Sequence, residues 1–573
     1  MRISKKIALA MVSAMMAATA WAVQAKRVQT THTQADGKPV TVTLVGDEFH
    51  HGHVTLDGYA VKQAQDGNFY YLNEGKLTSV MAHNEAARSA AEVAYVAQNE
   101  VNLTFAAQSS TAKRAPRKVS LKGVTQIPCL GSPHVPIIMV NYQDIKFKSD
   151  DPISIFNEHF MTGEKSAFKY FEEQSFGKFT PQYDILGLVE LSENRAAYGG
   201  NDRGGNDSGI GKMVAEACDS VAGVDWSLYD HDKDGEVDVV IVLYAGPGEA
   251  QGAKPETIWP CQWELDASDY GHVLVKGENV INKFAVFNEL IGYDDEGTTI
   301  DGIGTFCHEF SHCLGLPDFY ATNNMGYYGM GAWSIMDYGN YNDNANTPVG
   351  YTGYERWYLG WMDIEDAVPN TIMNIKPVKD GGKVYKVAND QDATGCEYLL
   401  LECRTQTGWE QFMAGSGLMI THVDYNETVW ANNTVNNNGQ RQRMTIYPAD
   451  NKASVYNEEG DLYPNAAGNN LLTDDSTPAA RVYTGDGSIK RLHKPITDIT
   501  RNDDGSITLK FMFTGLKGDV NNDGKVDVAD INCIIDVILE NVDASQFEGR
   551  ADVNGDGKVD VADINEVIDI ILQ

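Results

Sequence analysis

The chain has 573 residues, a length that corresponds to roughly three or four domains. Hydrophobic residues make up 42% of it, which is enough to form cores and excludes a wholly disordered protein. The 80 acidic residues outnumber the 45 basic ones and give a net charge of −35, the wrong sign for non-specific binding to nucleic acid. Calcium sites and a soluble secreted protein both require such an acidic surplus.

Residues 1–25 have the pattern of a signal peptide. Three basic residues among the first six precede an apolar run at 7–20, which is too short for a membrane-spanning helix. Small residues provide two cleavage sites, one after Ala25 and one after Ala20. We therefore expect an exported, extracellular protein with no membrane span.

Residues 26–118 have the features of a propeptide. Short alternating strands such as 40–44 are separated by Asp-Gly turns and followed by an Ala- and Glu-rich helix at 84–98. A basic, unpatterned segment at 108–118 follows and contains the pair Lys113-Arg114. Exposed segments of this kind are where proteases cut a chain. The sequence predicts a propeptide that is joined to the rest of the chain by a processing linker.

The next two regions differ in their patterning. Residues 119–365 combine long apolar strands, at 135–140 and 237–244, with helices such as an aromatic one around 167–171. This mixture predicts an α/β or α+β domain. Residues 366–515 consist mainly of short strands and Asn- and Gly-rich turns, and we expect a β-rich region there.

The sharpest signal in the chain is the motif H-E-F-S-H-C-L-G-L-P-D. His308 and His312 are four residues apart, so on a helix they project from one face and can share a metal ion. Two imidazoles suit zinc, and Glu309 can reach a water molecule at the metal. A turn at Gly315 allows the chain to reverse and bring Asp318 back as a third ligand. Three protein ligands leave one position open, which is the catalytic arrangement.

This motif, with Met336 downstream in Ser-Ile-Met-Asp-Tyr, resembles the immune inhibitor A-type metallopeptidases, which are secreted bacterial endopeptidases of the metzincin group. The resemblance extends to segments that begin at Pro136, Tyr170 and Tyr244, and it covers most of residues 40–515. It implies a metzincin-like catalytic domain at residues 119–365 with one catalytic zinc ion.

The resemblance also implies roles for individual residues. His308, His312 and Asp318 are expected to bind zinc, and Glu309 is expected to act as the general base for hydrolysis of peptide bonds. Met336 corresponds to the Met-turn beneath the metal. Tyr338 corresponds to a tyrosine that stabilises the tetrahedral intermediate in some metzincins, although a packed aromatic ring is an equal alternative.

The C-terminal segment contains a repeated loop, in which the sequence at 519–530 recurs at 552–563. Oxygen-bearing side chains occupy loop positions 1, 3, 5, 9 and 12, with glycine at position 6 and a backbone carbonyl available at position 7, as calcium requires. The predicted ligands are Asp519, Asn521, Asp523, Lys525, Asp527 and Asp530 in the first loop and Asp552, Asn554, Asp556, Lys558, Asp560 and Asp563 in the second.

An apolar helical pattern follows each loop, and the two loop–helix units resemble a type I dockerin, a small all-α domain, at residues 518–573. The resemblance implies two calcium ions, folding that depends on them, and a cohesin-like partner on a scaffold or surface protein. The chain departs from well-known dockerins at loop positions 10 and 11, where Val528-Ala529 and Val561-Ala562 replace pairs of hydroxyl residues.

A third acidic loop precedes the strand at 237–244. Asp230, Asp232, Asp234 and Asp238 occupy positions 1, 3, 5 and 9 of a calcium-loop pattern, but position 12 lacks an oxygen ligand. The loop is either a further calcium site in the catalytic domain or a glycine-containing turn.

Together these features predict a multidomain, secreted zinc endopeptidase that is made as a zymogen, acts on proteins or peptides, and docks through its dockerin to a cohesin-like partner. Two alternatives come from other functional classes. One is a catalytically idle surface adhesin that keeps the protease fold. The other is a carbohydrate-processing component of a dockerin-borne complex that degrades polysaccharides. The intact glutamate of the H-E-x-x-H motif favours the peptidase.

Overall fold

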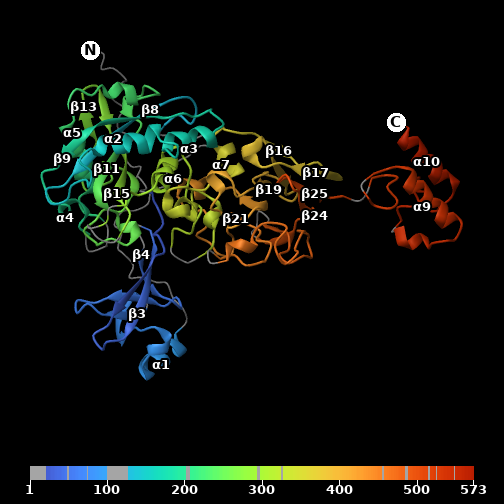
Figure 1. Ribbon diagram of the computed structural model, residues 1–573, viewed down its shortest axis with the longest axis horizontal. Helices are drawn as coiled ribbons and strands as arrows, with labels where there is room; N and C mark the ends of the chain where they lie inside the picture. Colours follow the sequence, from blue (N-terminus) through green and yellow to red (C-terminus); the bar gives the residue numbers. More distant parts are fainter. Residues whose placement is uncertain are drawn as a thin grey trace, which may run out of the picture.

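The computed structural model describes residues 21–572 except 48–50, 74, 100–126, 202–206, 293–296, 298, 324–326, 455–456, 484–487, 514–515, 524 and 548 (Figure 1). The leader before residue 21 and the predicted processing segment at 108–118 lie outside the described residues. An N-terminal β-sheet, a mixed α/β region and a C-terminal pair of helices follow one another, so the multidomain architecture predicted from the sequence is confirmed at this level.

The N-terminal sheet is antiparallel and contains six strands in sequential order. They are β2 (Gln29–Thr33), β3 (Pro39–Gly46), β4 (His51–Thr55), β5 (Ala60–Gln63), β6 (Phe69–Asn73) and β7 (Lys76–Met81). Helix α1 (Ala90–Gln98) begins later than the predicted residue 84 because Ser89 and Glu92 form a capping box there. Val42, Phe69 and Tyr71 are among the buried residues of this sheet.

The central region contains a six-stranded mixed sheet in the order β1-β12-β15-β11-β8-β9. Its strands are β1 (Trp21–Ala22), β8 (His134–Asn141), β9 (Gln182–Glu190), β11 (Val240–Pro247), β12 (Cys261–Glu264) and β15 (Lys283–Leu290). Strands β15, β11, β8 and β9 are parallel, whereas β12 is antiparallel to β15 and β1 is antiparallel to β12. The N-terminal end of the described chain thus forms one edge of the sheet.

Helices cover both faces of this sheet, because the apolar strands bury alternate residues in two different cores. Ile137 and Met139 face the core that contains α3 (Ala167–Gln174) and α6 (Ile303–Cys313), whereas Ile138 faces the core that contains α5 (Ile210–Ser220). Helix α6 carries the predicted zinc motif, and all eleven of its residues are buried.

The β-rich region contains a five-stranded sheet in the order β16-β18-β19-β20-β21 and a three-stranded sheet in the order β17-β25-β24. Strand β19 (Glu397–Arg404) buries Leu399 and Leu401 in a core of its own, but Tyr398 and Leu400 belong to the same core as α6. The β-rich region and the central region therefore share a continuous core.

The other strands of these two sheets are β16 (Ile364–Asp366), β17 (Thr371–Ile375), β18 (Val384–Ala388), β20 (Gly417–Asp424), β21 (Met444–Ile446), β24 (Ile496–Arg501) and β25 (Ile507–Phe511). Shorter strands are β10 (Glu236–Val237), β13 (Leu274–Lys276), β14 (Asn279–Ile281), β22 (Arg481–Tyr483) and β23 (Ile489–Arg491), and the remaining helices of these regions are α2 (Pro152–Asn157), α4 (Ala196–Gly199), α7 (Gly353–Tyr358) and α8 (Glu427–Ala431).

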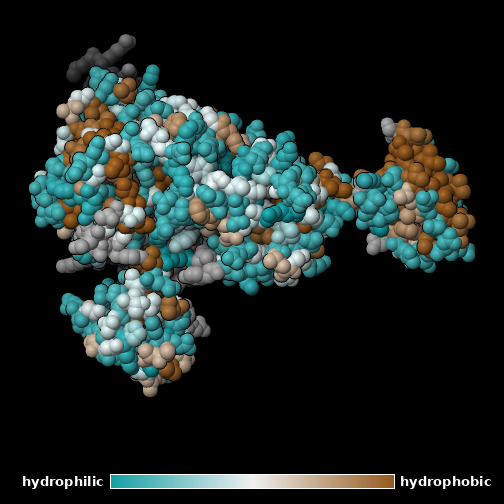
Figure 2. All heavy atoms as spheres, in the orientation of Figure 1, coloured by the Kyte–Doolittle hydropathy of each residue, from teal (hydrophilic) through white to brown (hydrophobic). Residues whose placement is uncertain are grey.

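The C-terminal region contains helices α9 (Val528–Ile538) and α10 (Val561–Ile571), which lie at the far end of the molecule (Figure 1). Val520, Ile534 and Val567 are among the residues of its small core. Apolar side chains gather on its outer surface over both helices (Figure 2). None of the helices in the described part of the chain is long and apolar enough to span a membrane.

Candidate active site

The zinc motif lies on helix α6, where two backbone carbonyls orient its histidines. His308 Nδ1 lies 2.7 Å from the carbonyl oxygen of Ile335, and His312 Nδ1 lies 2.8 Å from that of Leu316. A carbonyl can only accept a hydrogen bond, so the proton of each neutral ring is on Nδ1. Each Nε2 consequently presents a lone pair, which is the form of histidine that binds metals.

Asp318 completes a set of three ligand atoms. Its Oδ1 lies 3.2 Å from His308 Nε2 and 3.3 Å from His312 Nε2, and all three residues are almost fully buried. The chain reaches this point because Gly315, which follows α6, adopts a left-handed φ of +98°. Three lone-pair atoms that face one another without solvent fit a bound cation, and two imidazoles with one carboxylate fit zinc.

The electrostatics of this triad favour an ionised carboxylate at Asp318. Burial opposes ionisation of Asp318, but the neighbouring His312 and His308 outweigh it and hold the pKa of Asp318 well below its usual range. Burial lowers the pKa of His312. A carboxylate between two neutral imidazoles is the protonation state that binds a divalent metal.

Glu309 lies beside the same two histidines. Its side chain is fully buried, and one of its carboxylate oxygens is within 4.8 Å of the ligand nitrogens of both His308 and His312. The predicted base and the three predicted ligands are therefore brought together in one buried cluster.

The predicted Met-turn contacts this cluster through the carbonyl of Ile335. Met336 is fully buried, and its carbonyl accepts a hydrogen bond from the backbone N–H of Phe319 at 2.7 Å. The carbonyl of the preceding residue, Ile335, accepts the hydrogen bond from His308. Asp337 then accepts the backbone N–H groups of Met330 and Gly331, both at 2.8 Å. This turn therefore orients His308 and is bonded to Phe319, the residue that follows Asp318.

The sequence gives no sign of a further residue at the site, Asn433, which follows helix α8 in the β-rich region. Its Nδ2 donates to Asp318 Oδ2 at 2.5 Å, and its Oδ1 accepts from the backbone N–H of Asp318 at 2.7 Å. Asn433 adopts a left-handed φ of +51°, which asparagine tolerates better than most residues. The two hydrogen bonds fix Asp318 and leave its Oδ1 facing the histidines.

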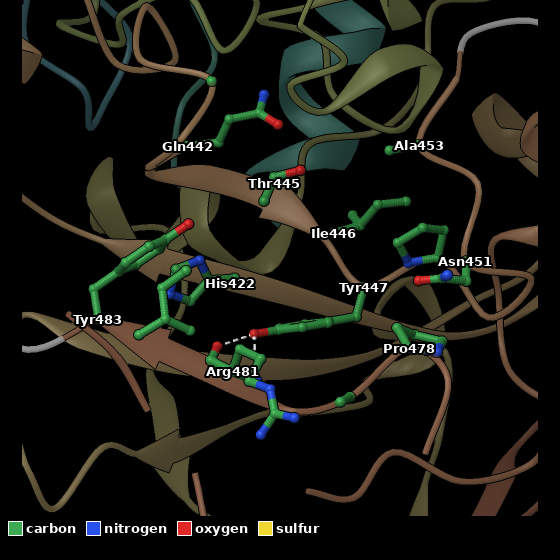
Figure 3. A pocket seen from close by; sticks show the side chains of 14 residues that line it. His422, Gln442, Thr445, Ile446, Tyr447, Asn451, Ala453, Pro478, Arg481 and Tyr483 are labelled. Carbon is green, nitrogen blue, oxygen red and sulfur yellow. Dashed lines mark hydrogen bonds between the residues drawn. The ribbon is translucent and has the colours of Figure 1, made fainter. Parts of the chain in front are cut away.

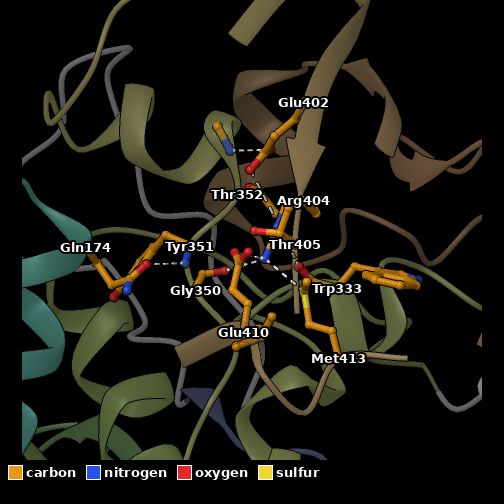
Figure 4. A network of polar contacts seen from close by, with 12 residues as sticks. Gln174, Trp333, Gly350, Tyr351, Thr352, Glu402, Arg404, Thr405, Glu410 and Met413 are labelled. Carbon is orange, nitrogen blue, oxygen red and sulfur yellow. Dashed lines mark hydrogen bonds and ion pairs between the residues drawn. The ribbon is translucent and has the colours of Figure 1, made fainter. Parts of the chain in front are cut away.

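The β-rich region also holds the Met-turn through buried charged groups. Arg404 of β19 forms an ion pair with Glu410 at 2.6 Å, donates to the carbonyl of Gly350 at 3.1 Å, and reaches the carbonyl of Trp333 at 3.4 Å (Figure 4). Asp461 accepts from the indole N–H of Trp333 at 2.8 Å. The segment that supports the histidines is thus anchored by residues more than sixty positions downstream.

Tyr338 contacts the N-terminal segment of the chain. Its hydroxyl accepts from the backbone N–H of Arg27 at 3.2 Å, and the Arg27 guanidinium lies 5.4 Å from its ring centroid. Trp259 and Tyr341 donate to the carbonyls of Val23 and Gln24, at 3.0 and 2.6 Å. Residues 21–27 therefore pass over the central region as a bound peptide, beside the Met-turn.

The two predicted calcium loops fold in the same way. Asp530 and Asp563, at position 12, are fully buried in the first turns of α9 and α10, and each accepts the backbone N–H of its helix's N-cap residue, Asp527 or Asp560, at 2.9 Å. Position 1 of each loop, Asp519 or Asp552, accepts the backbone N–H of position 5 at 3.0 Å. The glycine at position 6 of the first loop lies outside the described residues. The first carboxylate of each loop thus bonds the loop backbone, and the calcium ligand sets stay predictions.

The third acidic loop brings together only part of its predicted set. Oxygens of Asp230, Asp232 and Asp238 lie within 4.8 Å of one another. Asp234 instead uses its backbone N–H to bond Asp230 Oδ1 at 3.1 Å, and Asp238 pairs with His231 at 2.6 Å.

A separate cavity of about 410 Å³ opens in the β-rich region (Figure 3). Tyr447, Tyr483 and His422 contribute rings to its lining, and the Tyr447 hydroxyl bonds the Arg481 carbonyl. The residues of this cavity are drawn from positions 422–489, so it is distinct from the histidine cluster on α6.

Two family models match the chain. Residues 139–361 match the catalytic domain of the immune inhibitor A peptidase M6 family, and residues 517–572 match the dockerin type I domain. The first match contains the histidine cluster and the predicted Met-turn. The second contains the two repeated calcium-loop sequences at 519–530 and 552–563.

Curated relatives align with a smaller part of the chain. It is 28% identical over 247 residues to "Pre-pro-metalloprotease PrtV" of Vibrio cholerae serotype O1, an alignment that covers 38% of this chain and 26% of the relative. It is 27% identical over 214 residues to "Immune inhibitor A" of Bacillus thuringiensis subsp. alesti, covering 32% of this chain and 30% of the relative. The chain thus spans less than a third of each relative.

Proposed function

Because the chain carries a peptidase M6 catalytic domain and a C-terminal type I dockerin domain, we propose that it is a secreted zinc endopeptidase. It is made as a zymogen and attached to a cohesin-like partner. The observation that carries this proposal is the buried triad of His308, His312 and Asp318, with Glu309 beside it. The predicted boundaries at residues 118, 365 and 518 belong to the same proposal, whereas the leader is proposed to end at residue 20 and not at the predicted residue 25.

In this proposal His308, His312 and Asp318 hold the metal. Zinc bound there supplies a Lewis acid that lowers the pKa of water and polarises a peptide carbonyl. Glu309 accepts the proton of the attacking water and returns it to the leaving amine. We propose that Tyr338 donates a hydrogen bond from its hydroxyl to the developing oxyanion; in this structure the same hydroxyl accepts a hydrogen bond from the backbone N–H of Arg27.

The test compares the processed protein with its Glu309→Ala variant on casein, with the zinc content of both measured. We expect the variant to keep about one zinc per chain and to lose about 10²–10⁴-fold in kcat. Equal cleavage by the two proteins would remove Glu309 from the mechanism.

The same assay separates the two alternative functions. Zinc binding without cleavage of any protein substrate by the processed chain would favour the surface adhesin. Release of sugars from glycans, with casein left intact, would favour the carbohydrate-processing component.

Latency follows from the N-terminal segment. Residues 21 and 22 pair with the edge of β12 and Arg27 contacts Tyr338, so a substrate strand cannot occupy the same edge while this segment is bound. Val23 and Ala25 are buried in the central region, which favours removal of the leader after Ala20 over removal after Ala25. N-terminal sequencing of the secreted zymogen tests this proposal: Trp21 is the expected first residue, and Lys26 would contradict it.

The C-terminal domain supports the docking part of the proposal. Leu539 and Leu572 are 63% and 78% exposed, and Val528 and Val561 at loop position 10 are 63% and 60% exposed. The apolar surface in Figure 2 is thus available to a cohesin-like module. Its two loops are proposed to bind two calcium ions, so chelation by EGTA should unfold α9 and α10 and abolish docking. Docking that survives EGTA would contradict this.

The Asp230 loop is proposed as a third, structural calcium site on the strength of its three clustered carboxylates. The test removes position 1 of both repeated loops in an Asp519→Ala/Asp552→Ala double variant, strips its metal with a chelator and titrates it with calcium. We expect one calcium ion to bind per chain. If none binds, the Asp230 loop is an ordinary turn.

A further inference from the structure

The cavity in the β-rich region is large enough for a small ligand. Its volume of about 410 Å³ lies within the range of pockets that bind small molecules. Residues of strands β20, β21, β22 and β23 contribute to its lining. The proposed peptidase function does not use this cavity, so its lining requires a separate account.

Three rings form a continuous wall of the cavity. The centroid of the His422 ring lies 6.1 Å from that of Tyr447 and 5.8 Å from that of Tyr483. Glu397 fixes this wall, because its Oε1 lies 2.9 Å from His422 Nε2 and accepts the backbone N–H of Tyr483 at 2.5 Å. The Tyr447 hydroxyl donates to the Arg481 carbonyl and accepts from the Arg481 backbone N–H at 3.2 Å. Because this hydroxyl is already bonded, Tyr447 offers a ligand its ring.

Two hydrogen-bond donors lie at opposite ends of these rings (Figure 3). Gln442 is at one end, and its Nε2 is buried without a hydrogen-bond partner among the described residues. Arg481 is at the other end, and its guanidinium forms no ion pair within the described part of the chain. By contrast, the nearby Arg441 and Arg443 are both paired with Asp424, at 2.6 and 2.9 Å.

The described residues that line the cavity include no aspartate or glutamate, although the chain has 80 acidic residues and only 45 basic ones. An ammonium group would therefore lack a counter-charge there, whereas a carboxylate can pair with Arg481. Gln442 requires an acceptor, because a buried donor without a partner is unfavourable. The lining thus fits a ligand with a carboxylate at one end, an acceptor oxygen at the other and an apolar group between them.

The C-terminal end of a peptide chain carries these groups. Its last residue has a free carboxylate and a side chain, and the peptide bond before it supplies a carbonyl oxygen. We propose that the cavity binds peptide ends of this kind whose last side chain is aromatic or large and apolar. The carboxylate pairs with Arg481, the side chain packs on the three rings, and Gln442 donates to the preceding carbonyl.

Cleaved protein substrates are the source of such peptide ends in this proposal. Hydrolysis of a peptide bond adds one water molecule and creates one new C-terminal carboxylate, so the peptidase would generate ligands for its own β-rich region. This assignment of the source rests on the proposed peptidase function. Binding itself requires neither zinc nor turnover, so the cavity can be tested independently of the peptidase.

The first test compares N-acetyl-L-phenylalanine with N-acetyl-L-phenylalanine amide as ligands of the full-length Glu309→Ala protein. Both probes carry the ring and the acyl oxygen, and only the first carries a carboxylate. Ligand-observed NMR should give a dissociation constant at least about tenfold lower for the acid, because the amide loses the charge-assisted hydrogen bond to Arg481. Equal affinities, or no binding of the acid, would overturn the proposal.

Matched variants place the two ends of the ligand. Arg481→Gln should remove the preference for the acid and keep the affinity for the amide, which also shows that the variant is folded. Arg491→Gln, on the neighbouring strand β23, should keep the parental preference, because Arg491 is paired with Asp475. A preference that survives Arg481→Gln would place the carboxylate elsewhere, for example at the zinc site, and would contradict the proposal.

Gln442→Ala tests the other end. It should weaken the binding of both probes by the same factor, about threefold to tenfold, because both lose one hydrogen bond. Parental affinity for both probes would remove Gln442 from the site.

Digests of casein test the source of the ligand. A digest made by the processed enzyme should displace N-acetyl-L-phenylalanine from the Glu309→Ala protein, whereas the same mass of undigested casein should not. Displacement by a chymotryptic digest but not by the enzyme's own digest would overturn the assignment of the source and keep the carboxylate site. Failure of the processed enzyme to cleave casein would overturn the peptidase function, while the two probes would still decide what the cavity binds.

Discussion

The central region and the β-rich region both contribute residues to the candidate active site, but only the residues of the central region could be predicted from the sequence. Helix α6 places His308, Glu309 and His312 at fixed helical spacing, so its chemistry can be inferred from a single motif. The β-rich region contributes Asn433, Arg404 and Asp461, which are far apart in the sequence and have no motif. A local motif can supply a metal's ligands while the surrounding fold determines their orientation.

This comparison gives the β-rich region a role that its composition does not suggest. It shares a hydrophobic core with α6 and fixes both Asp318, the proposed third ligand, and the predicted Met-turn. We therefore expect changes in the β-rich region to alter the zinc site even where no ligand is touched.

The largest effect is expected from Arg404→Ala, which removes the ion-pair partner of the buried Glu410 carboxylate and leaves Glu402 paired with Arg356 at 3.8 Å. Breaking a buried ion pair from one side costs about 3–5 kcal/mol, so urea unfolding should show a loss of this size. The exposed Arg501→Ala variant should unfold like the parent. Equal stability of Arg404→Ala and the parent would argue that the two regions fold independently.

Asp461→Ala should have a smaller effect. It leaves the indole N–H of Trp333 and the hydroxyl of Tyr328 without their shared acceptor. A buried donor without a partner costs about 1–3 kcal/mol, and thermal unfolding should detect the loss. Asp475→Ala, at an exposed position, serves as the control. A melting temperature as high as the control's would mean that the Met-turn does not depend on the β-rich region.

The parts of this molecule that sequence reasoning recovers are those fixed by short-range periodicity. The zinc helix, Gly315 and the paired loops of the C-terminal domain all follow from spacing. Asn433 does not, because its contact with Asp318 spans 115 residues. Nor does the position of Lys26-Arg27, because only the folded chain brings the N-terminal segment to Tyr338.

The acidic cluster between the two regions should make stability depend on pH. Burial raises the pKa values of Asp337, Glu458 and Asp461 to about 7. Because their unfolded values are about 4, the folded state binds more protons between about pH 4 and 7, and this contribution is lost as the pH rises through that range.

Melting temperatures from pH 5 to 8, measured on the Glu309→Ala zymogen to prevent self-cleavage, should therefore fall with rising pH more steeply than in a variant that also carries Glu458→Gln. Identical slopes would mean that Glu458 does not titrate with folding.

The most direct test of the central claim is the zinc affinity of Asn433→Ala, measured by competition with a chelator and compared with the neighbouring Asn432→Ala. Asn433 touches no metal in this account and acts only through Asp318. We expect its loss to weaken zinc binding by about 10–100-fold, as is typical for partners of metal ligands, while Asn432→Ala binds zinc like the parent. Parental affinity in a folded Asn433→Ala protein would contradict the claim that the β-rich region completes the metal site.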